Sequence, residues 1–113
     1  MYEYKAELIR WIDGDTLLVE VDLGFHCKRE ERVRLARIDA WELNSDSAYR
    51  RRWAKSIRFK GRQICPEGEI LKINTSKNPR QDMYARYIAE VFYKGKNLSD
   101  ELLKLGRGIS VVK

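Results

Sequence analysis

Apolar and polar side chains alternate over the first 23 residues, and this pattern constrains the fold more than any other feature of the sequence. Successive side chains of a β-strand point to opposite faces, so a period of two predicts half-buried strands over residues 2–12 and 16–23. The two segments meet at Asp13-Gly14, a dipeptide that favours the tight turn of a hairpin. We therefore expect the chain to begin with an antiparallel β-hairpin.

The rest of the sequence predicts three further strands and two helices. Residues of high strand propensity fill 32–38, 69–75 and 86–93. After Ser45 or Asp46, either of which can cap a helix, apolar residues recur at helical spacing. They are Tyr49, Trp53, Ile57 and Ile64. Asn97 is expected to cap a short second helix that ends before Gly106. Its apolar side is expected to comprise Leu98, Leu102, Leu103 and Leu105.

The order of these elements is β-β-β-α-β-β-α, which matches the five-stranded, partly open barrel called the OB-fold. The predicted class is thus mainly β with helices (α+β). A chain of 113 residues can bury one core but not two, so residues 1–113 are expected to form one domain. OB-folds often bind nucleic acids or sugars.

Composition excludes several classes of protein. Hydrophobic residues make up 43% of the chain, too many for a disordered protein. There is no apolar run long enough to span a membrane and no signal-peptide pattern. We therefore expect no membrane association and a cytoplasmic location, or a secreted one if an export signal has been removed. Cys27, Cys65 and His26 are too few for a zinc site, and reduced structural cysteines are expected.

The formal charge of +6 is concentrated in one segment. Residues 47–66 carry seven basic and no acidic side chains, a charge of +7, whereas the rest of the chain sums to −1. One side of the predicted helix presents Arg51, Lys55, Arg58 and Arg62. These residues are open to two interpretations, a solvated outer face or a surface that steers phosphate groups.

Several polar residues recur in an order that is more specific than any of them alone. The motifs are Asp13-Gly14-Asp15-Thr16, Val33-Arg34-Leu35, Ile38-Asp39 with Glu42, Asp82 and Tyr84 with Arg86, and Asn97-Leu98 with Leu102-Leu103. In this order, from about Ala6 to Gly108, the chain resembles the thermonuclease family typified by staphylococcal nuclease. The resemblance implies an OB barrel and calcium-dependent hydrolysis of DNA and RNA to products that end in a 3′-phosphate.

The resemblance also assigns a metal site. Asp15 and Asp39 match the calcium-binding aspartates of the family, and the backbone carbonyl of Ala40 matches a further oxygen ligand. Calcium is a hard cation that prefers oxygen ligands, so the lack of histidine ligands is no obstacle. Glu42 matches the glutamate proposed as general base toward the attacking water.

Two arginines match the family residues that grip the phosphate, Arg34 and Arg86. A planar guanidinium donates two parallel hydrogen bonds to phosphate oxygens and stays charged. Tyr84 matches a tyrosine near the bound nucleotide, and Lys77 and Arg80 are further candidates for substrate binding.

The chain departs from the family pattern at several positions. Trp41 replaces a proline before Glu42, and Ala85 replaces a glycine before Arg86. The remaining departures are Ala40 for threonine, Met83 for lysine and Val112 for tyrosine.

Two functions from different classes remain open. The first is an active calcium-dependent nuclease acting on DNA, RNA or both. The second is a non-catalytic OB-fold module of nuclease descent that binds nucleic acid. An oligosaccharide-binding barrel is a distant third because it would not need a basic helix. Retention of the matched carboxylates and arginines favours the enzyme, with nucleic acid as substrate and no protein partner indicated.

Overall fold

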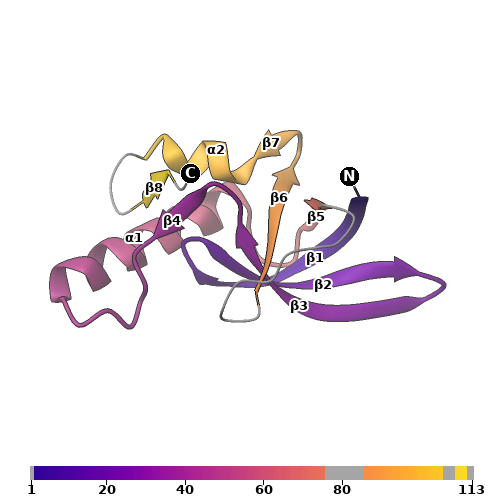
Figure 1. The fold of residues 1–113 in the computed structure, drawn as a ribbon, viewed down its shortest axis with the longest axis horizontal. Helices are drawn as coiled ribbons and strands as arrows, with labels where there is room; N and C mark the ends of the chain where they lie inside the picture. Colours follow the sequence, from indigo (N-terminus) through magenta and orange to yellow (C-terminus); the bar gives the residue numbers. More distant parts are fainter. Residues whose placement is uncertain (1, 76–85, 106–108, 112–113) are drawn as a thin grey trace.

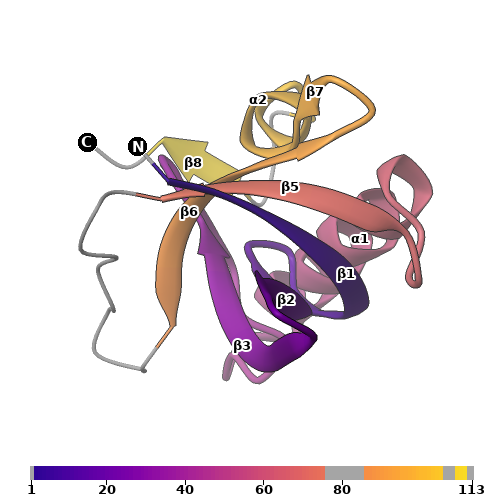
Figure 2. The same cartoon turned by 90° about the vertical axis from the view of Figure 1, so that its right-hand side faces the viewer.

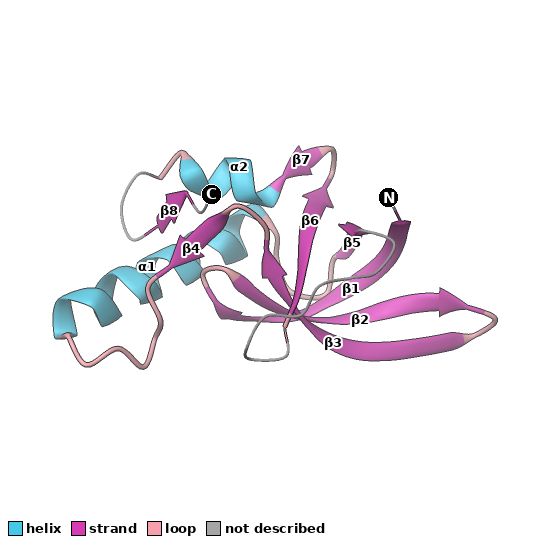
Figure 3. Cartoon of the chain, viewed as in Figure 1, coloured by secondary structure: helices cyan, strands magenta, loops and turns pink. Residues whose placement is uncertain are grey.

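A computed structural model of the chain describes residues 2–75, 86–105 and 109–111 (Figure 1). Five longer strands form a barrel, and they are β1 (Tyr2–Asp13), β2 (Thr16–Gly24), β3 (Cys27–Leu35), β5 (Ile70–Thr75) and β6 (Tyr87–Tyr93). The short strands are β4 (Ile38–Ala40), β7 (Lys96–Asn97) and β8 (Ile109–Val111). The helices are α1 (Ala48–Ile64) and α2 (Leu98–Leu103), both cyan in Figure 3.

The barrel is closed by a parallel pairing between two strands that are distant in sequence. Strand order is β3-β2-β1-β5-β6, with antiparallel neighbours throughout, and β3 pairs with β6 from Val33↔Tyr87 to Leu35↔Ala89. Figure 2 shows the five strands wrapped around a common interior, with both helices on the outside. This arrangement confirms the predicted mainly β OB-fold with two helices.

The core lies inside the barrel and beneath α1. Leu8, Leu17 and Val19 from the first hairpin are fully buried with the inward-facing residues of the other strands. Trp11 is also buried, and its Nε1 donates to the carbonyl of Cys65 at the end of α1 (3.0 Å). This hydrogen bond joins the C-terminal end of α1 to the C-terminal end of β1.

The β2–β3 hairpin extends beyond the barrel, toward the right of Figure 1. Its turn is made by Gly24, Phe25 and His26, which all have positive φ (82°, 53° and 62°). Phe25 is fully exposed. The extension gives the molecule its long axis of 46 Å against shorter axes of 27 and 21 Å.

Three local predictions were wrong. The predicted strand 32–38 is two strands, because Arg37 adopts a left-handed conformation (φ 71°) that ends β3 and begins β4 in a new direction. The cap of α1 is Ser47, not Ser45 or Asp46, and its side chain accepts from the backbone N–H of Arg50. Tyr49, expected on the apolar side of α1, is 57% exposed because the first turn extends past the barrel.

The end of the second predicted helix also differs. The described helix ends at Leu103, and Leu105 lies beyond it and is exposed, although its spacing placed it on the apolar side. Asn97 caps the helix as predicted, and its side chain accepts from the N–H groups of Ser99 and Asp100. The predicted stop at Gly106 lies outside the described residues.

The two cysteines are both free thiols in different surroundings. Cys65 is buried in the core, and burial raises the pKa of its thiol to about 12. Cys27 is exposed at the start of β3, so the expectation of a structural role holds for Cys65 alone.

None of the helices in the described part of the chain combines the length and apolarity needed to cross a bilayer.

Candidate active site

Asp15 lies at the centre of the candidate site. It sits in the β1–β2 turn, where Asp13 pairs with Thr16, and only 3% of its surface is exposed. Its Oδ1 accepts from the Thr16 hydroxyl (3.0 Å) and its Oδ2 accepts from the backbone N–H of Ala40 (3.1 Å). A buried carboxylate needs such donors, and here they come from its own hairpin and from β4.

Two arginines from different strands face this carboxylate. Arg34 stands opposite Thr16 in the β2–β3 ladder, and its Nε lies 3.9 Å from Asp15 Oδ2. Arg86 directly precedes β6, and its Nη1 donates to Thr16 Oγ1 (2.8 Å) and lies 4.0 Å from Asp15 Oδ1. Both side chains are largely buried, at 14% and 15% exposure. The parallel β3–β6 pairing brings them to the same carboxylate.

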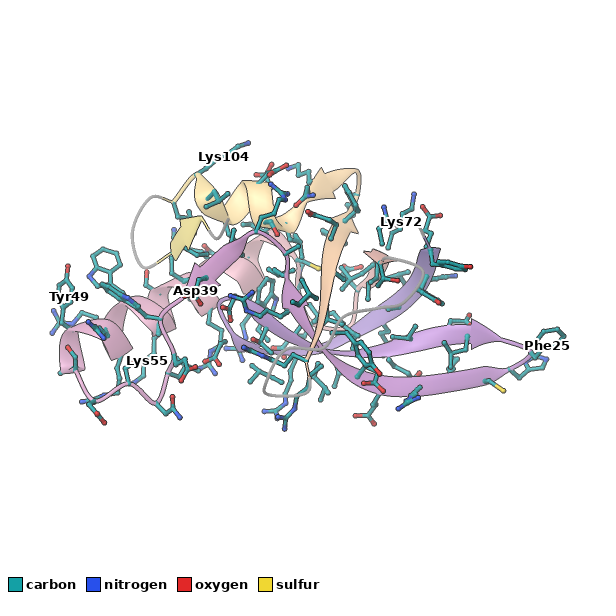
Figure 4. The ribbon with its side chains drawn as sticks, viewed as in Figure 1. Phe25, Asp39, Tyr49, Lys55, Lys72 and Lys104 are labelled. Atoms are coloured by element: carbon teal, nitrogen blue, oxygen red, sulfur yellow. The ribbon has the colours of Figure 1, made fainter. Side chains whose placement is uncertain are left out.

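Strand β4 supplies the second candidate metal ligand. Asp39 carries a 60% exposed side chain, labelled in Figure 4, and its Oδ1 accepts from Arg34 Nη2 (3.4 Å). The next residue, Ala40, is buried and holds Asp15 through its N–H. Asp15 and Asp39 therefore contact the same guanidinium, one from a buried position and one from the surface.

Burial and positive charge have opposite effects on the pKa of Asp15. Burial has the larger effect and raises the pKa of the carboxyl above its usual 3.8. The Ala40 N–H, the Thr16 hydroxyl and the two arginines lower it, but by less. The ionised carboxylate is thus incompletely compensated by the protein, and a bound cation would favour it.

The chemical nature of the groups around Asp15 is suited to binding a calcium ion. The carboxylates of Asp15 and Asp39 and the carbonyl of Ala40 are oxygen groups on neighbouring segments, the type of ligand that calcium prefers. Within the described residues, no group of three or more His, Cys, Asp or Glu side chains forms a ready-made metal site. Any calcium site here would therefore need water or substrate oxygens to complete its coordination.

Glu42 lines a hollow of about 520 Å³ beside this cluster. Thr16 and Arg86 line the same hollow, so the predicted general base shares it with one of the two arginines predicted to grip the phosphate. Asp13 fixes the loop that carries Glu42, because its Oδ1 accepts from the N–H of Leu43 (3.1 Å). Glu42 itself is exposed.

Trp41, at the position where the family has proline, is held by aromatic contacts. Its ring lies 5.7 Å from that of Tyr49, and the guanidinium of Arg50 lies over it at 5.8 Å from the ring centre. Tyr49 in turn contacts Trp53 edge to face. The loop before Glu42 therefore contacts the first turns of α1 through Trp41.

The four basic residues predicted to share one face of α1 make different contacts. Arg58 lines the hollow with Glu42, and Lys55 is exposed (Figure 4). Arg51 Nη1 donates to the carbonyls of Ser45 and Asp46 (2.6 and 2.8 Å), and Arg62 Nε lies 3.1 Å from Glu67. Arg51 and Arg62 thus serve local structure, and only Arg58 joins the candidate site.

Other predicted residues lie outside the described part of the chain. These are the candidate substrate-binding residues Lys77, Arg80 and Tyr84, and the departures Met83, Ala85 and Val112.

Sequence reasoning missed two arginines of the hollow, Arg10 on β1 and Arg32 on β3. Neither belongs to the motifs that carry the resemblance. The signal that could have found them is strand register, because Arg10 and Arg32 both pair with Leu18 of β2.

Comparison with known proteins shows the family to which the sequence is similar. The family model described as Staphylococcal nuclease homologue matches residues 32–112, more than two thirds of the chain. The chain is 27% identical over 102 residues to Endonuclease YncB of Bacillus subtilis, covering 90% of this chain and 46% of that protein. It is 23% identical over 123 aligned residues to the uncharacterized protein MJ1439 of Methanocaldococcus jannaschii, covering 91% and 57%.

The chain therefore spans about half the length of these curated relatives. The family match covers the end of β3 and all of β4, β5, β6 and both helices, and it includes Arg34, Asp39, Glu42 and Arg86 but not Asp15. From this match, the chain belongs to the staphylococcal nuclease homologue family.

Proposed function

We propose that this protein is a calcium-dependent nuclease that hydrolyses phosphodiester bonds of DNA, RNA or both and leaves 3′-phosphate ends. Family membership and the endonuclease relative support a nuclease-like or nucleic-acid-binding function. The observation that carries the catalytic proposal is the convergence of Arg34 and Arg86, within 4.0 Å, on the buried carboxylate of Asp15.

The two arginines are suited to stabilise charge on a phosphate undergoing substitution. In-line attack concentrates negative charge on the equatorial oxygens, and positive groups fixed in advance lower the barrier most. Arg34 and Arg86 are fixed by Asp15, Asp39 and Thr16, so little reorganisation is needed when the phosphate binds. Their low exposure reduces screening by water.

Glu42 and the metal ligands have separate roles in the proposal. Glu42 is exposed in the hollow, where its carboxylate can accept a proton from the attacking water. Asp15, Asp39 and the Ala40 carbonyl would hold calcium, which when bound would supply positive charge to the phosphate and lower the pKa of a bound water. Ala40 also donates its N–H to Asp15, which keeps that carboxylate in place.

The proposal is tested by incubating single-stranded DNA, duplex DNA and RNA with the protein in calcium, in magnesium and in chelator, followed by end-group analysis. We expect cleavage in calcium, 3′-phosphate ends and no cleavage in chelator. Cleavage that persists fully in chelator would refute the metal role. Binding to nucleic acid without cleavage in any condition would favour the non-catalytic module.

A further inference from the structure

The hollow beside the candidate active site contains three arginines that have no bonding partner among the described residues. Arg10, Arg32 and Arg58 line it together with Arg86 and Glu42. Within residues 2–75, 86–105 and 109–111, none of the three donates a hydrogen bond or forms an ion pair. By contrast, Arg34 and Arg86 are both engaged with Asp15.

Strand register places two of these arginines in one row across the outer face of the barrel. Arg10 of β1 pairs with Leu18 of β2, and Leu18 pairs with Arg32 of β3. Neighbouring strands lie about 4.8 Å apart, so the backbones of Arg10 and Arg32 are separated by roughly two such spacings. Arg32 precedes Val33, which pairs with Tyr87, and Arg86 precedes Tyr87. The row therefore continues from Arg32 to Arg86 at the candidate active site.

Helix α1 closes the other side of the hollow with Arg58. Two carboxylates also line it, and Asp13 already accepts from the N–H of Leu43. With both carboxylates ionised, the four guanidinium groups still leave a formal excess of two positive charges among the residues that line the hollow. Like charges gathered in one hollow repel each other, and this cost is offset when an anion binds between them.

We propose that Arg10, Arg32 and Arg58 form a second phosphate-binding subsite, which holds a phosphodiester next to the one gripped by Arg34 and Arg86. The substrate class is then an internal segment of a polynucleotide, with at least two consecutive phosphates bound at once. The inference rests on the proposed function only in taking the phosphate at Arg34 and Arg86 as the one that is cleaved. Binding at the second subsite is independent of cleavage.

The test measures binding of an oligodeoxythymidylate in chelator, at a series of salt concentrations. The variant carries Arg10→Gln, Arg32→Gln and Arg58→Gln together. Each phosphate neutralised on a single strand contributes about 0.7 to the slope of log affinity against log salt, so loss of the one phosphate held at the subsite should lower the slope by about 0.7. Arg58→Gln alone should lower it by less than the triple variant does. Affinity for a mononucleotide carrying a 3′-phosphate should not change.

The control is a variant with the same change in charge elsewhere, Lys72→Gln, Lys96→Gln and Lys104→Gln. Lys72 and Lys104 are labelled in the upper part of Figure 4, and none of the three control lysines lines the hollow. An unchanged slope in the arginine variant, or an equal fall in the control, would overturn the subsite. A slope that falls in a protein that cleaves nothing would support the subsite and refute the nuclease.

Discussion

Arg37 determines where β4 begins, although nothing in its local sequence predicts the conformation it adopts. A φ of 71° is uncommon outside glycine, so the surrounding structure must hold it. Its Nε and Nη2 donate to the two oxygens of Glu90 (2.6 and 3.1 Å), and its Nη1 donates to Asp100 (2.9 Å). The β3–β4 corner is thus fixed to β6 and α2, which sets the position of Asp39.

This corner leads to a prediction about stability and pH. Hydrogen bonds from Arg37 lower the pKa of Glu90, although partial burial opposes the effect. The pair therefore stabilises the fold fully above the ordinary Glu pKa of 4.5, and its contribution is lost as pH falls through the lowered pKa of the folded state. We expect Glu90→Gln to reduce the free energy of unfolding at neutral pH by about 1 to 2 kcal/mol. Urea denaturation at a series of pH values measures this.

Glu3→Gln is the matched control because Glu3 pairs with Lys72 at 3.5 Å on an exposed surface. We expect its effect at neutral pH to stay below about 1 kcal/mol. If Glu90→Gln cost the same stability at acidic and neutral pH, the carboxylate charge would not be what holds the corner.

At the scale of elements, α1 packs closely enough against the barrel to require a glycine. A Cβ at Gly61 would lie 2.8 to 3.0 Å from ring atoms of Trp11. The ring is buried and bonded through Nε1 to Cys65, so it has little freedom to move. Gly61 is therefore required by a close approach, since its φ is not positive.

Gly61→Ala tests this packing. Alanine gains about 1 kcal/mol of helix propensity, and overpacking typically costs about 1 to 3 kcal/mol. Because a rigid ring rather than a flexible chain end meets the new methyl group, we expect a net loss of about 1 to 2 kcal/mol in thermal or urea denaturation. Gln63→Ala, at an exposed position of α1, should leave stability unchanged or higher. A more stable Gly61→Ala protein would contradict the close packing.

The order of the main elements could be predicted because it depends on local periodicity. The hairpin turn, the strands and the helices each produce a pattern of side chains in the sequence, and four of the five barrel strands lie close to the predicted positions. Strand β3 differs, because it begins at Cys27, five residues before the predicted start. The break at Arg37 could not be predicted because ion pairs with Glu90 and Asp100, distant in sequence, hold it. The cap at Ser47 was missed because Ser45 and Asp46, directly before it, are equally good candidates by type.

At the scale of the whole molecule, the site is assembled from residues that are far apart in sequence. Asp15, Arg34 and Asp39 come from the N-terminal half, and Arg86 is brought to them by the parallel β3–β6 pairing. The sequence identified these residues only through the family resemblance, since no local pattern connects Arg86 with Asp15. Arg10 and Arg32 were not predicted as site residues because they are brought close together only by the pairing of β1 and β3 with β2.

The basic side chains that are clustered in the sequence do not form one cluster in the folded molecule. The basic segment that holds the excess charge is not one uniform surface, since Arg51 and Arg62 are used within the structure and Arg58 faces the hollow. Three of the arginines at the candidate site, Arg10, Arg32 and Arg34, lie on strands instead. The phosphate-steering role of Arg51, Lys55, Arg58 and Arg62 stays a prediction, and of these four Arg58 lines the hollow.

If Arg34 and Arg86 act together on one phosphate, the cleavage rate of a labelled oligonucleotide in calcium depends on both side chains. We expect Arg34→Lys and Arg86→Ala each to lower kcat/KM by about 100-fold or more, as for loss of a transition-state contact, with the melting temperature nearly unchanged. Arg52→Ala, at an exposed position of α1, serves as the control and should cleave normally. Unchanged cleavage by both arginine variants would show that these guanidinium groups do not act on the phosphate that is cleaved.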